Sequence, residues 1–189
     1  MQIPIRDYHF NKFMGKRTLI LGDLHSEKTR ILCKILEDGI ARQYRGISAI
    51  DMAPQRNVKG ESGNSLPESG VVLDSIHLLI PRRVYEPRAE GGDKREINQL
   101  AVWNAKNIGA QLRKFISSPT RALFMNDVTM YLHKGPLAIL LKAVSKSHTF
   151  IGTGFRGTIS LDDLETGISR REKKLIDRLT HYMDEVISV

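Results

Sequence analysis

The fold is decided by residues 17–36, RTLILGDLHSEKTRILCKIL. Leu19 to Leu21 form an apolar run, which predicts a short buried strand that ends at Gly22. An amphipathic helix is predicted from Lys28 onward, because apolar residues recur there at spacings of three and four, at Ile31, Leu32, Ile35 and Leu36. A buried strand followed at once by a helix is typical of a parallel sheet covered by helices.

The segment between this strand and helix is Gly22-Asp23-Leu24-His25-Ser26-Glu27-Lys28-Thr29. Its spacing matches the phosphate-binding pattern in which a glycine, four residues and a second glycine precede Lys and Ser or Thr. In such a loop the main-chain N–H groups of 22–27 surround the phosphates. Lys28 would neutralise the outer phosphates, and the Thr29 hydroxyl would bind Mg²⁺.

Glu27 departs from this pattern, because it stands where the second glycine is expected. That glycine usually has a positive φ, which costs a residue with a Cβ about 1 kcal/mol or more. A carboxylate beside the phosphates would also repel them unless it points outward. The alternative interpretation is an ordinary strand–turn–helix with an incidental Lys-Thr pair.

A second motif overlaps the same segment. Asp23-Leu24-His25 after an apolar strand resembles the opening Asp-x-His of calcineurin-type metallophosphoesterases, in which both side chains bind a metal. That family also requires an Asn-His pair and a Gly-His-x-His farther along. None of the remaining histidines stands in such a setting; they are His9, His77, His133, His148 and His181. This interpretation is therefore less favoured.

Composition indicates one globular domain over residues 1–189, with 41% hydrophobic residues to form its core. No run approaches the ~20 apolar residues that span a membrane, and residues 1–7 lack the apolar stretch of a signal peptide. The single cysteine, Cys33, excludes an intrachain disulfide framework. We expect a cytoplasmic protein that does not bind membranes.

The net charge of +8 and the pI of about 9.7 favour anionic partners. The cations occur in short clusters without interleaved aromatic residues, which make up only 6% of the chain. A nucleotide is therefore the expected partner, and nucleic acid is an alternative that is not favoured. The oligomeric state is left open.

Two further apolar runs end in an acid. Ile47–Ile50 leads into Asp51, and Ala122–Met125 leads into Asn126 and Asp127. An acid at the end of a strand can serve Mg²⁺ or a ribose, although it can equally be an ordinary end to a strand. Asp127 is the preferred candidate and Asp51 the second.

The rest of the chain is predicted to alternate strands and helices around this centre. Residues 1–16 are a lead-in expected to pack across the sheet edge, and 53–70 form a long irregular loop. Helices are expected over 94–117, capped by Asp93, over 137–144 and over 169–188, the last beginning with a capping box of Ser169 and Glu172. One or two further strands are expected over 71–73 and 76–80, and another at 149–151. The glycines at 152–157 that follow are spaced too irregularly for a dinucleotide-binding fingerprint.

With this alternation and the motif at 22–29, the chain resembles the P-loop nucleoside triphosphatases. The resemblance implies a three-layer α/β sandwich with a mainly parallel central sheet, which binds ATP or GTP with Mg²⁺. It implies that Lys28 and Asp127 are catalytic, and that Thr29 and Asp127, or Asp51, hold the metal. Transition-state charge would come from one of three arginines, Arg156, Arg170 or Arg171. No Asn-Lys-x-Asp base motif occurs, so the choice between ATP and GTP is open.

Three functional hypotheses follow from these motifs. The first is nucleotide binding and hydrolysis at residues 22–29. The second is a P-loop-fold protein that has lost catalysis and acts as a binding or scaffold module, which Glu27 and the basic surface favour. The third is the metal-dependent phosphoesterase suggested by Asp23 and His25.

Overall fold

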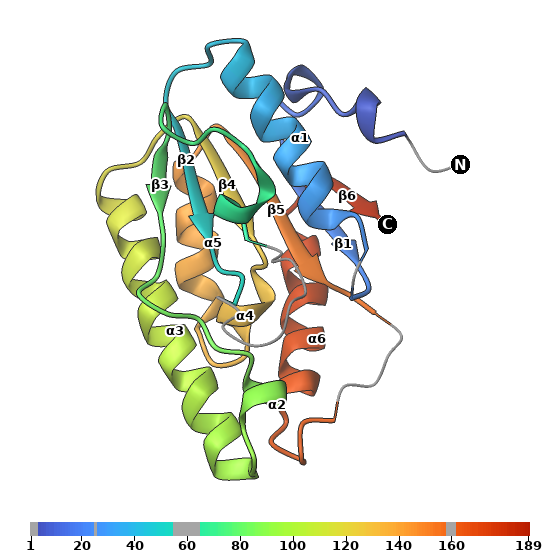
Figure 1. Ribbon diagram of the computed structural model, residues 1–189, viewed down its shortest axis with the longest axis vertical. Helices are drawn as coiled ribbons and strands as arrows, with labels where there is room; N and C mark the ends of the chain where they lie inside the picture. The colour runs from blue at the N-terminus through green and yellow to red at the C-terminus, as the bar shows by residue number, and fades with distance from the viewer. Residues whose placement is uncertain (1–3, 25, 55–64, 158–161) are drawn as a thin grey trace.

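The computed structural model describes residues 4–24, 26–54, 65–157 and 162–189 (Figure 1). Its centre is a sheet of parallel strands in the order β3-β2-β4-β5-β1-β6. The strands are β1 (Arg17–Gly22), β2 (Ile47–Asp51), β3 (His77–Leu79), β4 (Ala122–Asn126), β5 (Thr149–Phe155) and β6 (Glu185–Ser188). The predicted α/β sandwich with a parallel central sheet is confirmed.

Helices cover both faces of this sheet (Figure 1). They are α1 (Lys28–Ala41), α2 (Pro87–Glu90), α3 (Lys94–Ser117), α4 (Thr129–Leu132), α5 (Leu137–Lys146) and α6 (Ile168–Thr180). Short 3-10 turns occupy Ile5–Asp7, Phe10–Lys12 and Pro67–Ser69. None of the helices in the described ranges is both long and apolar enough to cross a bilayer.

The order of the strands explains which helices share a face. The connection from β1 to β2 runs along the sheet in one direction, whereas those from β3 to β4, β4 to β5 and β5 to β6 run in the other. Because parallel crossovers share one hand, opposite directions place helices on opposite faces. Accordingly α1 packs over one face, and α3, α5 and α6 over the other.

The strands are buried on both sides, as the apolar runs of the sequence predict. In β1, Leu19 and Leu21 point into the core under α3, α5 and α6, whereas Ile20 points into the core under α1. In β4, Leu123 and Phe124 divide in the same way. This alternation is the period of two that a pleated strand imposes.

The N-terminal lead-in packs on the face covered by α1. Phe10 is fully buried, and its ring centroid lies 4.7 Å from that of Tyr44 and 6.1 Å from that of Phe124 in β4. Contact with the edge strand comes from Lys16, whose ammonium lies 3.4 Å from the Glu185 carboxylate. The segment therefore completes the core under α1 rather than only closing the sheet edge.

Residues 53–70 were predicted to form a long loop, and 55–64 of them lie outside the described residues. Beyond them, Leu66 is buried and a 3-10 turn follows. Of the one or two strands predicted over 71–73 and 76–80, the second segment forms β3, whereas residues 71–73 are not a strand and Val72 is 70% exposed. β3 is correspondingly short and lies at the edge of the described sheet, where it pairs with β2.

The strand predicted at 149–151 is longer than expected, because β5 continues to Phe155 into the glycine-rich segment. β5 lies between β1 and β4, so its backbone hydrogen-bonds on both sides. A Cβ at Gly152 would lie 2.6 Å from the Phe150 ring, so the glycine leaves room for that ring. The glycines here serve packing in a central strand.

The C-terminal helix predicted over 169–188 is wrong in its second half. α6 ends at Thr180, and Glu185–Ser188 form β6, which pairs with β1. The apolar residues of this segment satisfy a helical period and a strand period equally, so periodicity alone favours the longer helix. Residues 185–188 form a strand because they can pair with the free edge of β1.

Candidate functional site

The loop between β1 and α1 is tightly folded at the carboxyl edge of the sheet. The Ser26 N–H donates to the Asp23 carbonyl at 3.3 Å, and the Leu24 N–H donates to the Asp23 carboxylate at 2.7 Å. A Cβ at Gly22 would lie 2.6 Å from Ser26 Oγ and would also collide with the Val189 carbonyl, so this turn requires glycine. His25 lies outside the described residues.

Lys28, in the first turn of α1, points back over this loop. Its Nζ donates to the Asp23 carbonyl and, at 3.0 Å, to Ser26 Oγ. Burial lowers the pKa of Lys28, while the charges of Asp127 and Asp23 act to raise it. A partly desolvated ammonium at the mouth of a backbone loop gains strongly from a bound anion.

Glu27 does not disturb the loop in the way its position suggests. Its φ is −68°, an ordinary value, so the predicted backbone strain is absent. Its side chain is 52% exposed, and its carboxylate forms an ion pair with Arg30 at 3.1 Å. The carboxylate is therefore engaged on the outer surface of α1.

Thr29 faces the end of β4. Its hydroxyl donates to Asn126 Oδ1 at 3.1 Å, and the Thr153 hydroxyl donates to the same oxygen at 3.0 Å. On the other side Asn126 Nδ2 donates to the Asp51 carboxylate at 3.0 Å. Because a carboxylate only accepts, this contact orients the amide so that its oxygen faces Thr29.

Asp51 is buried at the end of β2 and is not exposed at the edge of the sheet. Only 4% of it is exposed, and it also accepts the N–H of Leu66 at 2.8 Å and that of Ala53 at 3.2 Å. Burial raises the pKa of Asp51, against the effect of these hydrogen bonds. Its observed contacts hold Asn126 and the chain near Leu66; its assignment as a metal ligand stays a prediction.

Asp127 follows β4 in a left-handed backbone conformation, with φ of 56°. Its N–H donates to the Thr153 hydroxyl at 2.8 Å, and its carboxylate accepts the Thr129 hydroxyl. Burial raises the pKa of Asp127 and the charge of Glu172 adds to this, while Thr129, His133 and Lys28 lower it. The structure thus brings Lys28, Thr29 and Asp127 to one edge of the sheet.

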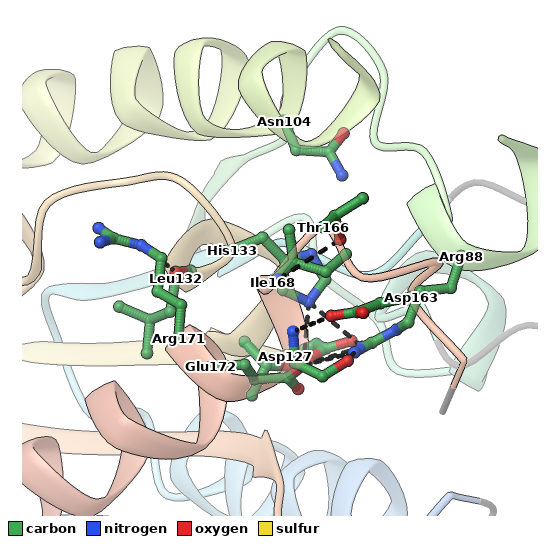
Figure 2. A network of polar contacts seen from close by, with 12 residues as sticks. Arg88, Asn104, Asp127, Leu132, His133, Asp163, Thr166, Ile168, Arg171 and Glu172 are labelled. Carbon is green, nitrogen blue, oxygen red and sulfur yellow. Dashed lines mark hydrogen bonds and ion pairs between the residues drawn. The ribbon is translucent and has the colours of Figure 1, made fainter. Parts of the chain in front are cut away.

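Beside Asp127 is a buried polar network that the sequence did not indicate (Figure 2). The carboxylate of Glu172, in α6, accepts hydrogen bonds from both terminal nitrogens of Arg88, at 2.8 and 2.9 Å. The same carboxylate lies 3.1 Å from His133 Nε2. Burial acts to raise the pKa of Glu172, but His133 and Arg88 outweigh it and hold that pKa below its ordinary value. The network ties α2, the end of α4 and α6 together.

The predicted capping box of Ser169 and Glu172 is wrong. The residue that precedes α6 is Gly167, in the left-handed conformation, and it provides no side-chain cap. The Ser169 N–H instead donates to the Asp163 carboxylate at 2.9 Å. Glu172 is drawn inward because Arg88, on a distant helix, neutralises it.

The three candidate arginines lie in different settings. The Arg156 N–H donates to the Gly22 carbonyl at 2.9 Å, so Arg156 lies beside the loop, and its guanidinium forms an ion pair with Asp177 at 3.1 Å. Arg171 donates to the carbonyls of Leu132 and Gly135 and is committed to that turn. Arg170 is exposed on α6.

Candidate metal ligands at this edge are oxygen donors. The Thr29 hydroxyl and the Asp127 carboxylate belong to the ligand types that Mg²⁺ prefers. Within residues 4–24, 26–54, 65–157 and 162–189, no group of three or more His, Cys, Asp or Glu side chains could hold a metal by itself. A Mg²⁺ ion here would need ligands from a bound phosphate as well.

No known family matches the sequence, and no curated protein matches it. Among solved structures, the flagellar accessory protein FlaH from Methanocaldococcus jannaschii aligns with 93% of this chain and 71% of its own length. The two share 10% sequence identity and a TM-score of 0.49. A likeness at this level carries neither a function nor a site residue over to this chain.

Proposed function

We propose that this protein binds a nucleoside triphosphate together with Mg²⁺ at residues 22–29 and hydrolyses it. One observation carries the proposal: Lys28 and Thr29 open α1 directly after β1, with the Lys28 ammonium turned over the loop backbone and the Thr29 hydroxyl turned toward the end of β4. This is the arrangement that phosphate binding at a strand–loop–helix turn requires.

The start of α1 supports anion binding in a second way. Glu27, the residue before the helix, makes no side-chain hydrogen bond to the first turn. In this proposal the N–H groups of that turn would bind a phosphate, and the positive end of the helix dipole favours negative charge there. The loop also lies at the carboxyl edge of a parallel sheet, where ligands of such folds bind.

In this proposal Thr29 and Asp127 would hold the Mg²⁺ ion, which supplies charge neutralisation on the phosphates when bound. Asn126 keeps the Thr29 hydroxyl in place, because Thr153 and Asp51 fix its amide from both ends. Asp127 would accept a hydrogen bond from the attacking water.

Titration calorimetry with ATP–Mg²⁺ and GTP–Mg²⁺ tests the binding step. Lys28→Ala should weaken binding about tenfold or more, the effect of losing a charge-assisted hydrogen bond. Lys106→Ala removes the same charge from an exposed position of α3 and should leave the affinity unchanged. Equal heats from wild-type protein and Lys28→Ala would show that no phosphate occupies this loop.

A nucleotide-binding protein without hydrolysis is the second candidate. It is favoured by the end of β4, where the side chain bonded to Thr29 is the neutral Asn126. A phosphate-release assay separates the two functions. Binding of ATP–Mg²⁺ without any release of phosphate would support the second candidate and contradict the first.

A further inference from the structure

A second candidate site lies at the opposite edge of the sheet. Arg17 begins β1, five residues before the phosphate loop, and so lies at the amino edge. Here a hollow of about 350 Å³ lies between α5 and the turn after α6. Its walls include the apolar side chains of Leu141 and Val144, the cations Arg17 and Lys142, and Tyr182. An apolar hollow with cations at its rim fits a planar ligand that carries negative charge.

Tyr182 supplies an exposed aromatic surface at this hollow. The residue is 49% exposed, although most of the large apolar and aromatic side chains of the described residues are buried. The Tyr182 N–H donates to the Leu179 carbonyl at 3.0 Å, so Tyr182 lies in a hydrogen-bonded turn directly after α6 ends at Thr180. Nucleic-acid bases stack on such rings with little regard for sequence.

Positive charge leads from the hollow along α6. Lys174 and Arg178 are four residues apart and lie on one face of α6, and Tyr182 follows four residues later in the turn after the helix. Arg170 and Lys173 are exposed on the same helix. From Arg170 to Arg178 this row covers about 12 Å at 1.5 Å per residue.

Within the described residues the side chains of these cations lack ion-pair partners, although the Asp184 carboxylate accepts the main-chain N–H of Arg17 at 2.8 Å. For residues 4–24, 26–54, 65–157 and 162–189, no ion pair with a carboxylate is found for Arg17, Lys142, Lys174 or Arg178. Asp177, the acid on this part of α6, is instead paired with Arg156. A row of uncompensated cations attracts a polyanion.

We propose that this surface binds single-stranded nucleic acid, with one base stacked on Tyr182 in the hollow and the phosphates following Arg17, Lys142 and the cations of α6. A single strand fits better than an acidic protein, because a base can stack on the exposed Tyr182 ring beside the apolar wall, whereas a carboxylate can use only the cations. The site is separate from the phosphate loop and does not depend on nucleotide binding there.

Fluorescence anisotropy with a labelled oligouridylate of about twelve nucleotides tests the proposal. We expect Tyr182→Ala to weaken binding about tenfold and Tyr182→Phe to retain it, because the ring and not the hydroxyl stacks. The double variant Lys174→Gln/Arg178→Gln should weaken binding and reduce its salt dependence. Lys106→Gln, which removes one exposed charge from α3, should behave as wild type.

Three results would overturn the proposal. The first is no binding of the oligonucleotide by the wild-type protein, and the second is equal binding by Tyr182→Ala. The third is displacement by polyglutamate as effective as displacement by unlabelled oligonucleotide, which would indicate an acidic protein partner. The experiment also separates this site from the loop at residues 22–29. If Lys28→Ala abolishes oligonucleotide binding and Tyr182→Ala retains it, the oligonucleotide binds at that loop, and the proposal for the Tyr182 surface is wrong.

Discussion

At the scale of single residues, Glu27 decides whether residues 22–29 can accept a phosphate. An acid in place of glycine matters if it strains the backbone or fills the loop. With φ of −68° and a carboxylate bonded to Arg30, it does neither. The described part of the loop has two features that the proposed phosphate binding needs, namely a required glycine at position 22 and a lysine over the backbone.

Replacement of Glu27 by glycine should therefore change nucleotide affinity by no more than about threefold, because an exposed charge and its surface ion pair are worth little. Calorimetry on the Glu27→Gly variant measures this directly. A gain of tenfold or more would show that the carboxylate blocks the loop, and would favour the hypothesis of a degenerate, non-catalytic protein.

Asp127 is the residue where stability and function are expected to conflict. Burial raises the pKa of Asp127, so above that pKa its buried charge lowers the free energy of unfolding. This destabilisation disappears as the pH falls and the carboxyl becomes protonated. Asp127→Asn should raise the free energy of unfolding at pH 7 by about 1 kcal/mol, and the gain should vanish near pH 4. Asn also tolerates the left-handed φ, whereas Asp127→Ala should lose about 1 kcal/mol there.

Urea unfolding at the two pH values measures these differences. The same Asn variant should bind ATP–Mg²⁺ but release phosphate about a hundredfold more slowly than wild type, as expected for loss of a proton acceptor. Unchanged phosphate release in Asp127→Asn would remove this residue from the proposed mechanism.

At the scale of elements, α2 and α6 are joined by the buried pair of Arg88 and Glu172. Their side chains are 13% and 3% exposed, so removing one leaves the other uncompensated in the interior. Arg88→Met should cost about 3 kcal/mol of unfolding free energy. Arg83→Met is the matched control: its ion pair with Glu90 is 3.7 Å long and half exposed, so its loss should cost less than about 1 kcal/mol.

The pH dependence of this pair has a defined sign. Because the folded state lowers the pKa of Glu172 from its ordinary value of 4.5, the pair stabilises the protein above that value and loses its effect as pH falls through the folded pKa. The difference between wild type and Arg88→Met should therefore shrink in acid. A constant difference from pH 7 to pH 3 would show that Arg88 acts through packing alone.

At the scale of the whole molecule, the two proposed sites occupy opposite edges of one sheet. The phosphate loop lies where β1 ends, and the hollow at Tyr182 lies where β1 begins. α6 runs from Ile168, beside the network of Arg88 and Glu172, to Thr180, two residues before Tyr182 (Figure 2). Because the two proposed sites have no residue in common, a substitution in one leaves the residues of the other unchanged.

The sequence pattern predicted correctly those helices and strands whose apolar residues fit either the helical period or the strand period, but not both. The helix at α3 begins where Asp93 predicts, with the Asp93 carboxylate accepting the Glu96 N–H at 2.8 Å. β1, α1 and β4 also lie where their apolar runs place them. The boundary between α6 and β6 was missed because pairing with β1 is a contact between residues more than 160 positions apart.

The sequence by itself determined the α/β class, the turn from β1 into α1, and the presence of Lys28 and Thr29 at the head of that helix, since these depend on residues within a few positions of one another. Only the tertiary structure decided that Asn126 faces Thr29, that Glu172 pairs with Arg88, and that Tyr182 meets Arg17 at a hollow. Those neighbours come from separate elements, and their distances are set by how the strands order themselves in the sheet. Periodicity carries no information about that order.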